Sequence, residues 1–392
     1  MHEEVAVSEV LDIDGLRVLV GDDQADVLEA LRLLLKGNGC RTVTVDSPQA
    51  LLRAAQAESF DLILMDLNYA RDTTSGQEGL DLLKRLHEER IQAPVIVMTA
   101  WGNVELAVEA MHRGACDFVQ KPWDNTRLLA AISKQAREAR ERASAERLAR
   151  SEIEIARNVQ QRLFPRKSKE LATIHYAASC IPAREVSGDY YDFLDLGPGA
   201  LGFVLADVSG KGMPAALLMA NLQACFRSRF EQGAQPAPAL LRSINKLFHE
   251  STRPEHYATL FYGEYEDATR ELRYVNCGHL APVLSRADGS VERLEATATV
   301  LGLFADWDCE RRTVKLHPGD RLLVFSDGIA EAGLDGDAGS DEEFGEDRLI
   351  ALAGTLDGGE IEEAVERILE AVREFHPGPA ADDMTVLAVR AL

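Results

Sequence analysis

Short apolar runs alternate with helical patterns over the first third of the chain. Residues 25–36 repeat apolar positions at helical spacing and are followed by Gly37 and Gly39. Strands and helices that alternate in this way predict a parallel sheet with helices on both faces, a doubly wound α/β domain over residues 15–126. The strand-like runs occupy residues 16–23, 40–47, 60–66, 93–100 and 117–122.

The next segment, 127–165, predicts one long helix that links two domains. Residues 127–163 contain no Gly or Pro and are rich in Ala, Arg and Glu, which favours a helix that ends before Pro165. Two apolar seams with coiled-coil spacing and shifted phase run along it. A dimerising signalling helix and a solvated spacer helix both fit this pattern. The seams are Ile132, Ala136, Ala139 and Ala143, then Ala149, Ile153, Ala156 and Leu163.

The remainder, 166–392, groups its strand-like runs more than it alternates them. Helical stretches at 214–231, 236–250 and 360–375 lie between strand-like runs such as LGFVLADVS and MTVLAVRA. Grouped strands with interleaved helices predict a layered α+β domain.

Composition narrows the classes of function. The chain has 392 residues, 46% hydrophobic and 27% charged, which is typical of a soluble globular protein. A net charge of −23 argues against nucleic acid or an anionic membrane surface as a direct partner. No apolar run approaches the roughly 20 residues that span a bilayer. The acidic N-terminus has no apolar signal core, so we expect the protein in the cytoplasm. Six scattered cysteines without a CxxC pair predict reduced thiols.

Acidic residues follow two of the predicted parallel strands. Asp22 and Asp23 end the first strand, and Asp66 ends the third. Strand ends lie side by side in such a sheet, so three carboxylates would surround one cavity and favour Mg²⁺ or Mn²⁺. Thr99 and Lys121 end the next two strands and would face the same crevice, as a hydroxyl donor and a counter-charge for a phosphoryl group.

The motifs GDD, LILMDLN, VMTA and VQKP, at these separations, resemble the response-regulator receiver family over about 110 residues. The resemblance implies that Asp66 accepts a phosphoryl group from a sensor histidine kinase. It also implies Mg²⁺ held by Asp22, Asp23, Asp66 and the carbonyl of Asn68.

The receiver resemblance also implies a switch. Thr99 would move toward the phosphoryl group, Phe118 would be the coupled aromatic, and Lys121 would complete the site. Trp101, two positions after Thr99, is expected to shield the acyl phosphate from water.

Four further aspartates lie in glycine-marked segments that we expect to be turns after strands: Asp189, Asp207, Asp327 and Asp382. Phosphomonoester hydrolysis benefits from two metals that hold the phosphate and generate hydroxide. Aspartates without His or Cys favour Mg²⁺ or Mn²⁺ over zinc. The adjacent glycines allow a backbone carbonyl to approach a metal.

These blocks, in this order, resemble the PPM family of metal-dependent serine/threonine phosphatases, in its sporulation and sigma-regulatory branch. The resemblance covers about residues 153–392, and EIEIARNVQQRLFP is similar to that branch's switch helix. It implies that Asp207 bridges two metals with the Val208 carbonyl on the first, and that Asp327 and Asp382 bind the second. Asp189 would bind directly or orient a metal water.

Three other polar residues of this segment have competing interpretations. Arg184 lies where some family members keep a phosphate-binding arginine, although a surface arginine in a loop fits as well. His279 in CGHLAP suggests a general acid, but a structural turn is favoured. Lys211 in SGKG lacks the spacing of a P-loop.

The sequence therefore predicts a two-component response regulator in which Asp66 phosphorylation controls a phosphatase through the helix, which is also the expected homodimer contact. Its substrate, by resemblance, is a phosphoserine or phosphothreonine on a regulatory protein such as an anti-sigma-factor antagonist. The alternative is a pseudophosphatase adaptor that binds a partner without hydrolysis; loss of metal aspartates would mark it, and all four are present. A transcription factor is disfavoured, because no helix-turn-helix or basic face is found.

Overall fold

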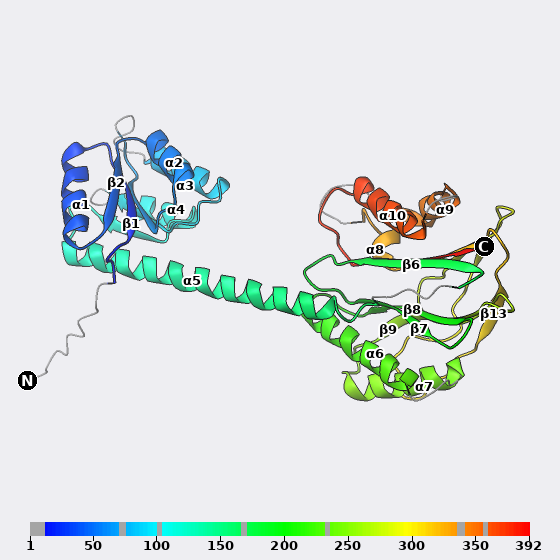
Figure 1. Ribbon diagram of the computed structural model, residues 1–392. Helices are drawn as coiled ribbons and strands as arrows, with labels where there is room; N and C mark the ends of the chain where they lie inside the picture. The colour runs from blue at the N-terminus through cyan, green and yellow to red at the C-terminus, as the bar shows by residue number, and fades with distance from the viewer. Residues whose placement is uncertain are drawn as a thin grey trace, which may run out of the picture. The chain divides into compact units, whose positions relative to one another are not determined.

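The computed structural model describes residues 12–69, 76–99, 104–165, 171–231, 236–334, 342–355 and 360–392. The chain divides into two compact units, Met1–Arg150 and Ser151–Leu392 (Figure 1). None of the helices in the described ranges is both long enough and apolar enough to cross a membrane.

The first unit is built on a five-stranded parallel sheet with the strand order β2-β1-β3-β4-β5. One apolar cluster contains Leu19, Ile63 and Val97, and a second contains Val18, Leu62 and Ile96, so neighbouring residues of one strand serve opposite faces. The predicted doubly wound fold is confirmed. Its elements are β1 Arg17–Gly21, α1 Ala25–Gly37, β2 Arg41–Val45, α2 Pro48–Ala57, β3 Leu62–Asp66, α3 Gln77–Glu88, β4 Val95–Thr99, α4 Val104–His112 and β5 Asp117–Gln120.

Helix α5, Asn125–Gln160, begins in the first unit and ends in the second. Its one uninterrupted run of 36 residues confirms the predicted linker helix. The first predicted seam is wrong at its start, because Ile132 and Ala136 are buried in the core of the first unit. The second is wrong at its end, because the helix stops at Gln160 and Leu163 lies in the following turn.

A different apolar stripe of α5 faces solvent. Leu148, Ile155 and Val159 are 63%, 61% and 58% exposed, and their spacing of seven and four residues places them on one side of the helix. This stripe, rather than the two predicted seams, is the part of α5 that a second chain could cover.

The second unit contains two five-stranded sheets that pack face to face. One has the order β13-β10-β9-β8-β7 and the other β12-β11-β14-β15-β6. An apolar cluster that includes Phe203, Phe261 and Leu387 draws residues from both sheets and fills the space between them. Helices α6 and α7 cover the first sheet and α8, α9 and α10 lie against the second, which gives four layers (Figure 1).

The predicted layered α+β fold is confirmed for this unit. Its strands are β6 Ile174–Ile181, β7 Asp189–Asp195, β8 Ala200–Val208, β9 Ala258–Glu266, β10 Glu271–Cys277, β11 Val283–Ser285, β12 Val291–Arg293, β13 Arg312–Lys315, β14 Arg321–Phe325 and β15 Met384–Ala391. Its helices are α6 Met213–Glu231, α7 Ala237–Ser251, α8 Asp327–Ala330, α9 Gly345–Thr355 and α10 Ile361–Phe375.

The expectation that all four aspartates follow strands is wrong for two of them. Asp207 lies near the end of β8 and Asp327 follows β14, but Asp189 begins β7 and Asp382 precedes β15. Paired strands here are antiparallel, so the start of one lies beside the end of the next. Asp189 and Asp207 are direct partners in the β7–β8 register.

Candidate functional site

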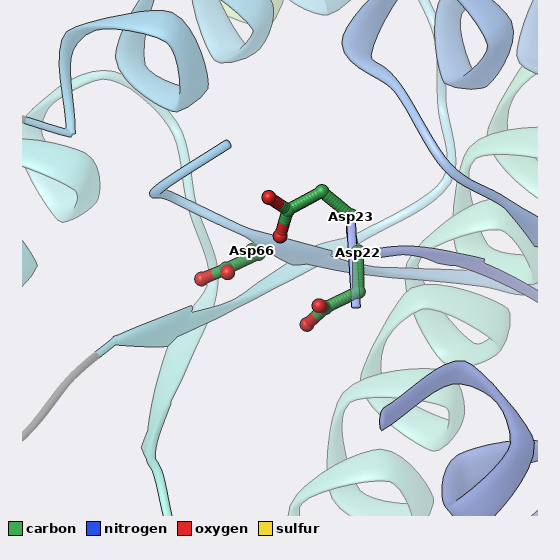
Figure 2. A group of neighbouring side chains, drawn as sticks. All are labelled: Asp22, Asp23 and Asp66. Carbon is green, nitrogen blue, oxygen red and sulfur yellow. The ribbon is translucent and has the colours of Figure 1, made fainter. Parts of the chain in front are cut away.

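Three carboxylates of the first unit meet at the carboxyl ends of β1 and β3. Asp22 and Asp66 are buried and Asp23 is half-buried, and one oxygen of each lies within 4.8 Å of the others. Figure 2 shows the three side chains gathered beside these strand ends. The parallel sheet thus brings together the acids that the sequence predicts as neighbours.

Lys121 follows β5 and bonds to two of these acids. Its Nζ donates to Asp22 at 2.6 Å and to Asp66 at 2.8 Å. Burial raises the pKa of Asp66, and Lys121 offsets only part of that rise. Burial alone would lower the pKa of Lys121, but its bonds to the two carboxylates raise it. The ammonium is therefore held as a counter-charge beside Asp66.

The donor set of this cluster fits a hard divalent cation. Asp23 Oδ1 and Asn68 Oδ1 are buried and have no hydrogen-bond partner among the described residues. Buried oxygens without partners are costly, and a cation would satisfy them. Oxygen donors alone favour Mg²⁺ over softer ions.

The other predicted receiver residues occupy two different environments. Thr99 ends β4, is 3% exposed, and accepts the Lys121 backbone N–H at its carbonyl at 2.8 Å. Phe118, in β5, is 46% exposed. Trp101 and residues 70–75 lie outside the described residues.

Sequence reasoning missed Tyr69, three residues after Asp66. It is 3% exposed, and its pKa is raised by burial and then by Asp66 and its acidic neighbours. A phenol three positions after Asp66 gives no signal in the sequence beyond its proximity.

The four aspartates of the second unit influence one another's charge. Burial and then Asp207 raise the pKa of Asp189. Burial, followed by Asp327 and Asp382, raises the pKa of Asp207 to about 7. The pKa of Asp327 is raised by burial and then by Asp382. The fold thus concentrates negative charge that a bound cation would relieve.

A fifth aspartate, Asp383, organises the backbone around these acids. One of its oxygens accepts the Ala183 N–H at 2.7 Å, and the other accepts from the Gly188 N–H at 2.6 Å and the Ser187 hydroxyl at 2.8 Å. Asp383 therefore ties the segment before β7 to the segment before β15. The pair Asp382–Asp383 was available in the sequence, but the sequence does not show which of the two faces the backbone.

Side chains on the second sheet complete this connection. The Thr385 hydroxyl donates to Asp189 at 2.5 Å. The Ser326 hydroxyl donates to the Asp383 carbonyl at 2.9 Å and accepts from the Thr385 N–H at 2.9 Å. Asp189 of the first sheet is thereby held by residues of the second.

Close approach of other segments excludes a side chain at one glycine beside these acids and crowds a second. A Cβ at Gly328 would lie 2.3 Å from the Asp383 carbonyl oxygen. A Cβ at Gly188 would lie 3.3 Å from the Val208 carbonyl oxygen, the predicted ligand. Both positions let neighbouring segments pack against a metal-ligand candidate.

Lys211 borders the aspartates, and Arg184 lies near the turn that follows Asp207. Lys211 Nζ lies 2.7 Å from Asp382 and donates to the Ala381 carbonyl at 2.9 Å. Arg184 is exposed, and its guanidinium approaches Gly212, where an added Cβ would be 3.6 Å from Nη1. A cavity of about 420 Å³ opens beside Asp382 and Gly328, with Val372 and Met384 among its apolar lining.

The donors of the second unit also fit hard cations, because the aspartates supply only oxygen. Their arrangement is looser than in the first unit. Over the described ranges, only Asp22, Asp23 and Asp66 bring three acidic, His or Cys ligand atoms within 4.8 Å of one another.

His279 has the environment of a structural residue. It is 6% exposed, its Nδ1 lies 2.9 Å from the Thr259 hydroxyl, and burial lowers its pKa to about 4. Thr259 pairs with Asp207 in the β8–β9 register. His279 therefore bonds to β9, the strand paired with that of Asp207, and a neutral histidine has no charge to contribute at neutral pH.

Family comparisons divide the chain at the same linker. The family described as stage II sporulation protein E (SpoIIE) matches residues 197–392, half of the chain. The family described as response regulator receiver domain matches residues 18–133.

Each of three curated relatives matches less than half of this chain. The phosphoserine phosphatase RsbU of Bacillus subtilis (strain 168) is 34% identical over 183 residues, which are 46% of this chain and 54% of RsbU. The phosphoserine phosphatase RsbP of the same organism is 27% identical over 46% of this chain and 45% of its own length. The transcriptional regulatory protein FixJ of Bradyrhizobium diazoefficiens is 36% identical over 34% of this chain and 62% of FixJ. The chain thus spans about half the length of the phosphatases it matches.

Solved structures agree on the fold. The SiaA-PP2C domain of Pseudomonas aeruginosa has a TM-score of 0.54 at 18% identity, over 63% of this chain and 99% of that one. The PP2C phosphatase domain of SpoIIE from Bacillus subtilis, with a fragment of its regulatory domain, has a TM-score of 0.50 at 23% identity, over 57% and 64%. At these identities the likeness describes the fold of the second unit alone.

Proposed function

We propose, from the premise that this chain belongs to the stage II sporulation protein E (SpoIIE) family and carries a response regulator receiver domain, that it is a metal-dependent protein serine/threonine phosphatase under receiver control. The observation that carries this proposal is the group of four mutually repelling aspartates at strand ends of two packed sheets.

Each aspartate has a role that follows from its place. Asp207 and the Val208 carbonyl would hold one Mn²⁺ or Mg²⁺, Asp327 and Asp382 a second, and Asp189 would bind or orient a metal water. The metals, when bound, would neutralise the phosphate and lower the pKa of bound water. The chain's own contribution is to fix these oxygens: Thr385 holds Asp189, and the Asp383 segment holds the backbone before both β7 and β15.

Arg184 is the candidate phosphate-binding side chain. Its guanidinium reaches toward the turn after Asp207, and a planar guanidinium can bind two phosphate oxygens. We assign it the orientation of the phosphoester rather than the chemical step.

The substrate class is a phosphoserine or phosphothreonine on a regulatory protein, such as an anti-sigma-factor antagonist. Two relatives of the second unit are named phosphoserine phosphatases, which supports the phosphoserine part of this proposal. The open cavity beside Asp382 would leave room for a polypeptide next to the phosphate.

The enzyme proposal is tested by hydrolysis of p-nitrophenyl phosphate and of phosphoserine peptides by the full chain with Mn²⁺. We expect activity that a chelator abolishes and Mn²⁺ restores, and that Asp327→Asn removes. If the folded wild-type chain stays inert with Mn²⁺ on every substrate, the adaptor alternative replaces the enzyme.

Receiver control rests on the cluster around Asp66. We propose that Asp66 accepts a phosphoryl group from a sensor histidine kinase, with Mg²⁺ held by Asp22, Asp23, Asp66 and the Asn68 carbonyl. Lys121 already lies against Asp66 and would neutralise the added charge. Thr99, at the end of the adjacent strand, would donate a hydroxyl to the phosphoryl oxygen, and Phe118 would change its packing with it.

The route from receiver to phosphatase is helix α5, whose first turns lie in one core while its last residue belongs to the other unit. We propose boundaries of 15–126 for the receiver, 127–165 for the linker and 166–392 for the phosphatase. We also propose a homodimer through the exposed stripe of Leu148, Ile155 and Val159, because three large apolar residues on one helix face favour association.

Control is tested with beryllofluoride, a stable phosphoryl mimic, on the full chain with Mg²⁺ and Mn²⁺. The wild type should change its hydrolysis rate, in either direction, and Asp66→Asn should lose that response. An identical rate with and without beryllofluoride in the wild type would contradict receiver control.

A further inference from the structure

The last residue of helix α5, Gln160, is buried although its neighbours are exposed. It is 7% exposed, whereas Val159 is 58% exposed and Gln161 is exposed. Its Nε2 donates to the Ser187 carbonyl at 2.7 Å, and its Oε1 accepts from the Ser187 N–H at 2.9 Å. One side-chain amide thus satisfies both backbone groups of a single residue.

Ser187 connects this contact directly to the aspartates. It is fully buried, its hydroxyl donates to Asp383 at 2.8 Å, and the same hydroxyl accepts the Asp189 N–H at 3.0 Å. Asp189 therefore lies two residues after Ser187, whose backbone Gln160 holds. Asp382 is the residue before Asp383, whose carboxylate accepts the Ser187 hydroxyl. A path of two hydrogen bonds, first from Gln160 to Ser187 and then from Ser187, leads from the helix to Asp189 or to Asp383 beside Asp382.

We propose that Gln160 is the positioning residue through which helix α5 sets the place of Asp189 and of the Asp382–Asp383 segment, an inference that rests on the proposed phosphatase function. Gln160 does not touch substrate or metal; it acts through Ser187.

The double bond makes this contact sensitive to the rotation of the helix. Successive residues of an α-helix point about 100° apart. A rotation by one position that presents Val159 to Ser187 would break both bonds, because valine has no polar side-chain group. The Ser187 N–H and carbonyl are buried, so losing both partners at once is costly unless the 187–189 segment also moves. Such a movement carries Asp189 with it.

The turn after α5 supports the contact. The Leu163 N–H donates to the Gln160 carbonyl at 2.8 Å, and the Phe164 ring packs on Tyr191 at a centroid distance of 5.0 Å. Tyr191 is two residues beyond Asp189 in β7, so the chain after the helix is anchored to the same strand.

The test compares Gln160→Leu with Gln161→Leu, a matched control of the same residue type on an exposed position, in the full chain. Gln160→Glu is the conservative variant, because it keeps an acceptor for the Ser187 N–H and loses the donor to its carbonyl. Three quantities are measured for each protein: kcat and KM for p-nitrophenyl phosphate, the Mn²⁺ concentration for half-maximal activity, and hydrogen exchange of the amides of residues 187–189.

We expect Gln160→Leu to lower kcat or raise the half-activating Mn²⁺ concentration at least tenfold, with KM changed less than twofold. Gln160→Glu should fall between, and Gln161→Leu should match the wild type. Exchange at residues 187–189 should be faster by tenfold or more in Gln160→Leu alone. If Gln160→Leu is too unstable to purify, the Gln160→Glu and Gln161→Leu pair decides by the same criteria.

The outcomes separate this inference from the proposed function. Equal kinetics and equal exchange in the Gln160 and Gln161 variants of an active wild type overturn the positioning role and leave the phosphatase intact. A wild type without hydrolysis overturns the proposed function, and hydrogen exchange then decides whether Gln160 holds the 187–189 segment. A uniform loss of stability in Gln160→Leu, with exchange at 187–189 no faster than elsewhere, also overturns the proposal.

Discussion

The carboxylates of the receiver come from neighbouring strands of one parallel sheet, whereas those of the phosphatase half come from strand ends of two different sheets. In the receiver, hydrogen bonding within the sheet already brings Asp22 and Asp66 together. In the phosphatase half, Asp189 and Asp207 share one sheet, and Asp327 and Asp382 flank strands of the other. The second site therefore depends on the packing of its sheets, and the first does not.

That difference determines what holds each site. Lys121 links two of the receiver acids directly. The phosphatase acids are held through Asp383 and Thr385, whose bonds join residues 196 apart in sequence, and through Ser326, whose bond joins residues 57 apart. A site built between sheets should be more sensitive to substitutions in its supports.

The largest expected effect separates the two clusters. Asp207→Asn removes a proposed bridging ligand and should lower phosphatase kcat by about 1,000-fold or more, in line with the loss of a metal-ion catalyst. The same variant should still take up phosphate at Asp66 from acetyl phosphate, whereas Asp22→Asn should not. Steady-state hydrolysis and phosphate-affinity gels measure the two. Loss of phosphate uptake in Asp207→Asn would show that the receiver cluster depends on the phosphatase cluster.

A smaller but still large effect should follow from adding a side chain at Gly328, where the segment after β14 packs against the segment before β15. Gly328→Ala places a Cβ 2.3 Å from the Asp383 carbonyl, and backbone must move to relieve it. We expect a loss of about 3 kcal/mol in the free energy of unfolding and a matching fall in activity, measured by urea denaturation and hydrolysis.

Gly354→Ala is the control for that substitution. Nothing lies within 4 Å of its added Cβ, and the residue is in helix α9. It should stabilise the chain by up to about 1 kcal/mol. Equal effects of the two substitutions would contradict close packing at Gly328.

His279 should make the phosphatase half sensitive to acid. Its pKa is lowered from 6.5 to about 4 by burial, so the unfolded chain binds a proton that the folded chain excludes. Stability from this group is present above pH 6.5 and is lost as the pH falls toward 4, by about 2 kcal/mol between pH 7 and pH 5.

Urea denaturation at both pH values measures this loss in the wild type and in His279→Gln. The variant should lose about 2 kcal/mol less between the two pH values. His317→Gln, at an exposed position of the same half, should keep the wild-type dependence. The same slope in all three proteins would show that His279 is not buried in neutral form.

The smallest effect concerns substrate orientation. Arg184→Ala should raise KM about fivefold with little change in kcat, because a solvent-exposed guanidinium contributes binding rather than chemistry. Arg184→Lys should recover only part of the affinity, since an ammonium cannot bind two oxygens in a plane. Arg253→Ala, another exposed position, is the control; an equal change there would remove Arg184 from the site.

The sequence was sufficient to predict the features that depend on local patterns of apolar and polar residues. Alternating apolar runs placed all five receiver strands, and strand ends then placed Asp22, Asp66, Thr99 and Lys121 near one another. The phosphatase aspartates were found as residues, but Asp189 and Asp382 were assigned to the wrong ends of strands, because the order of antiparallel strands is not encoded locally.

Contacts between distant segments could not be predicted in this way. The roles of Asp383, Ser187 and Gln160 depend on which backbone group each side chain meets, and no spacing in the sequence specifies that. The first predicted seam failed at Ile132 for the same reason, because an apolar helix position does not state whether it packs on its own domain or on another chain. The second failed at Leu163 because the helix stops at Gln160.

The unbroken length of helix α5 also limits how such proteins can be rearranged by recombination. Because each added or deleted residue rotates everything beyond it by about 100°, a new sensory domain joined at an arbitrary position would misalign the end of the helix. Fusions that change the length in steps of seven residues shift the phase by only about 20°. Functional hybrids should therefore occur in a periodic series of linker lengths, and that series could be selected from a library of random junctions.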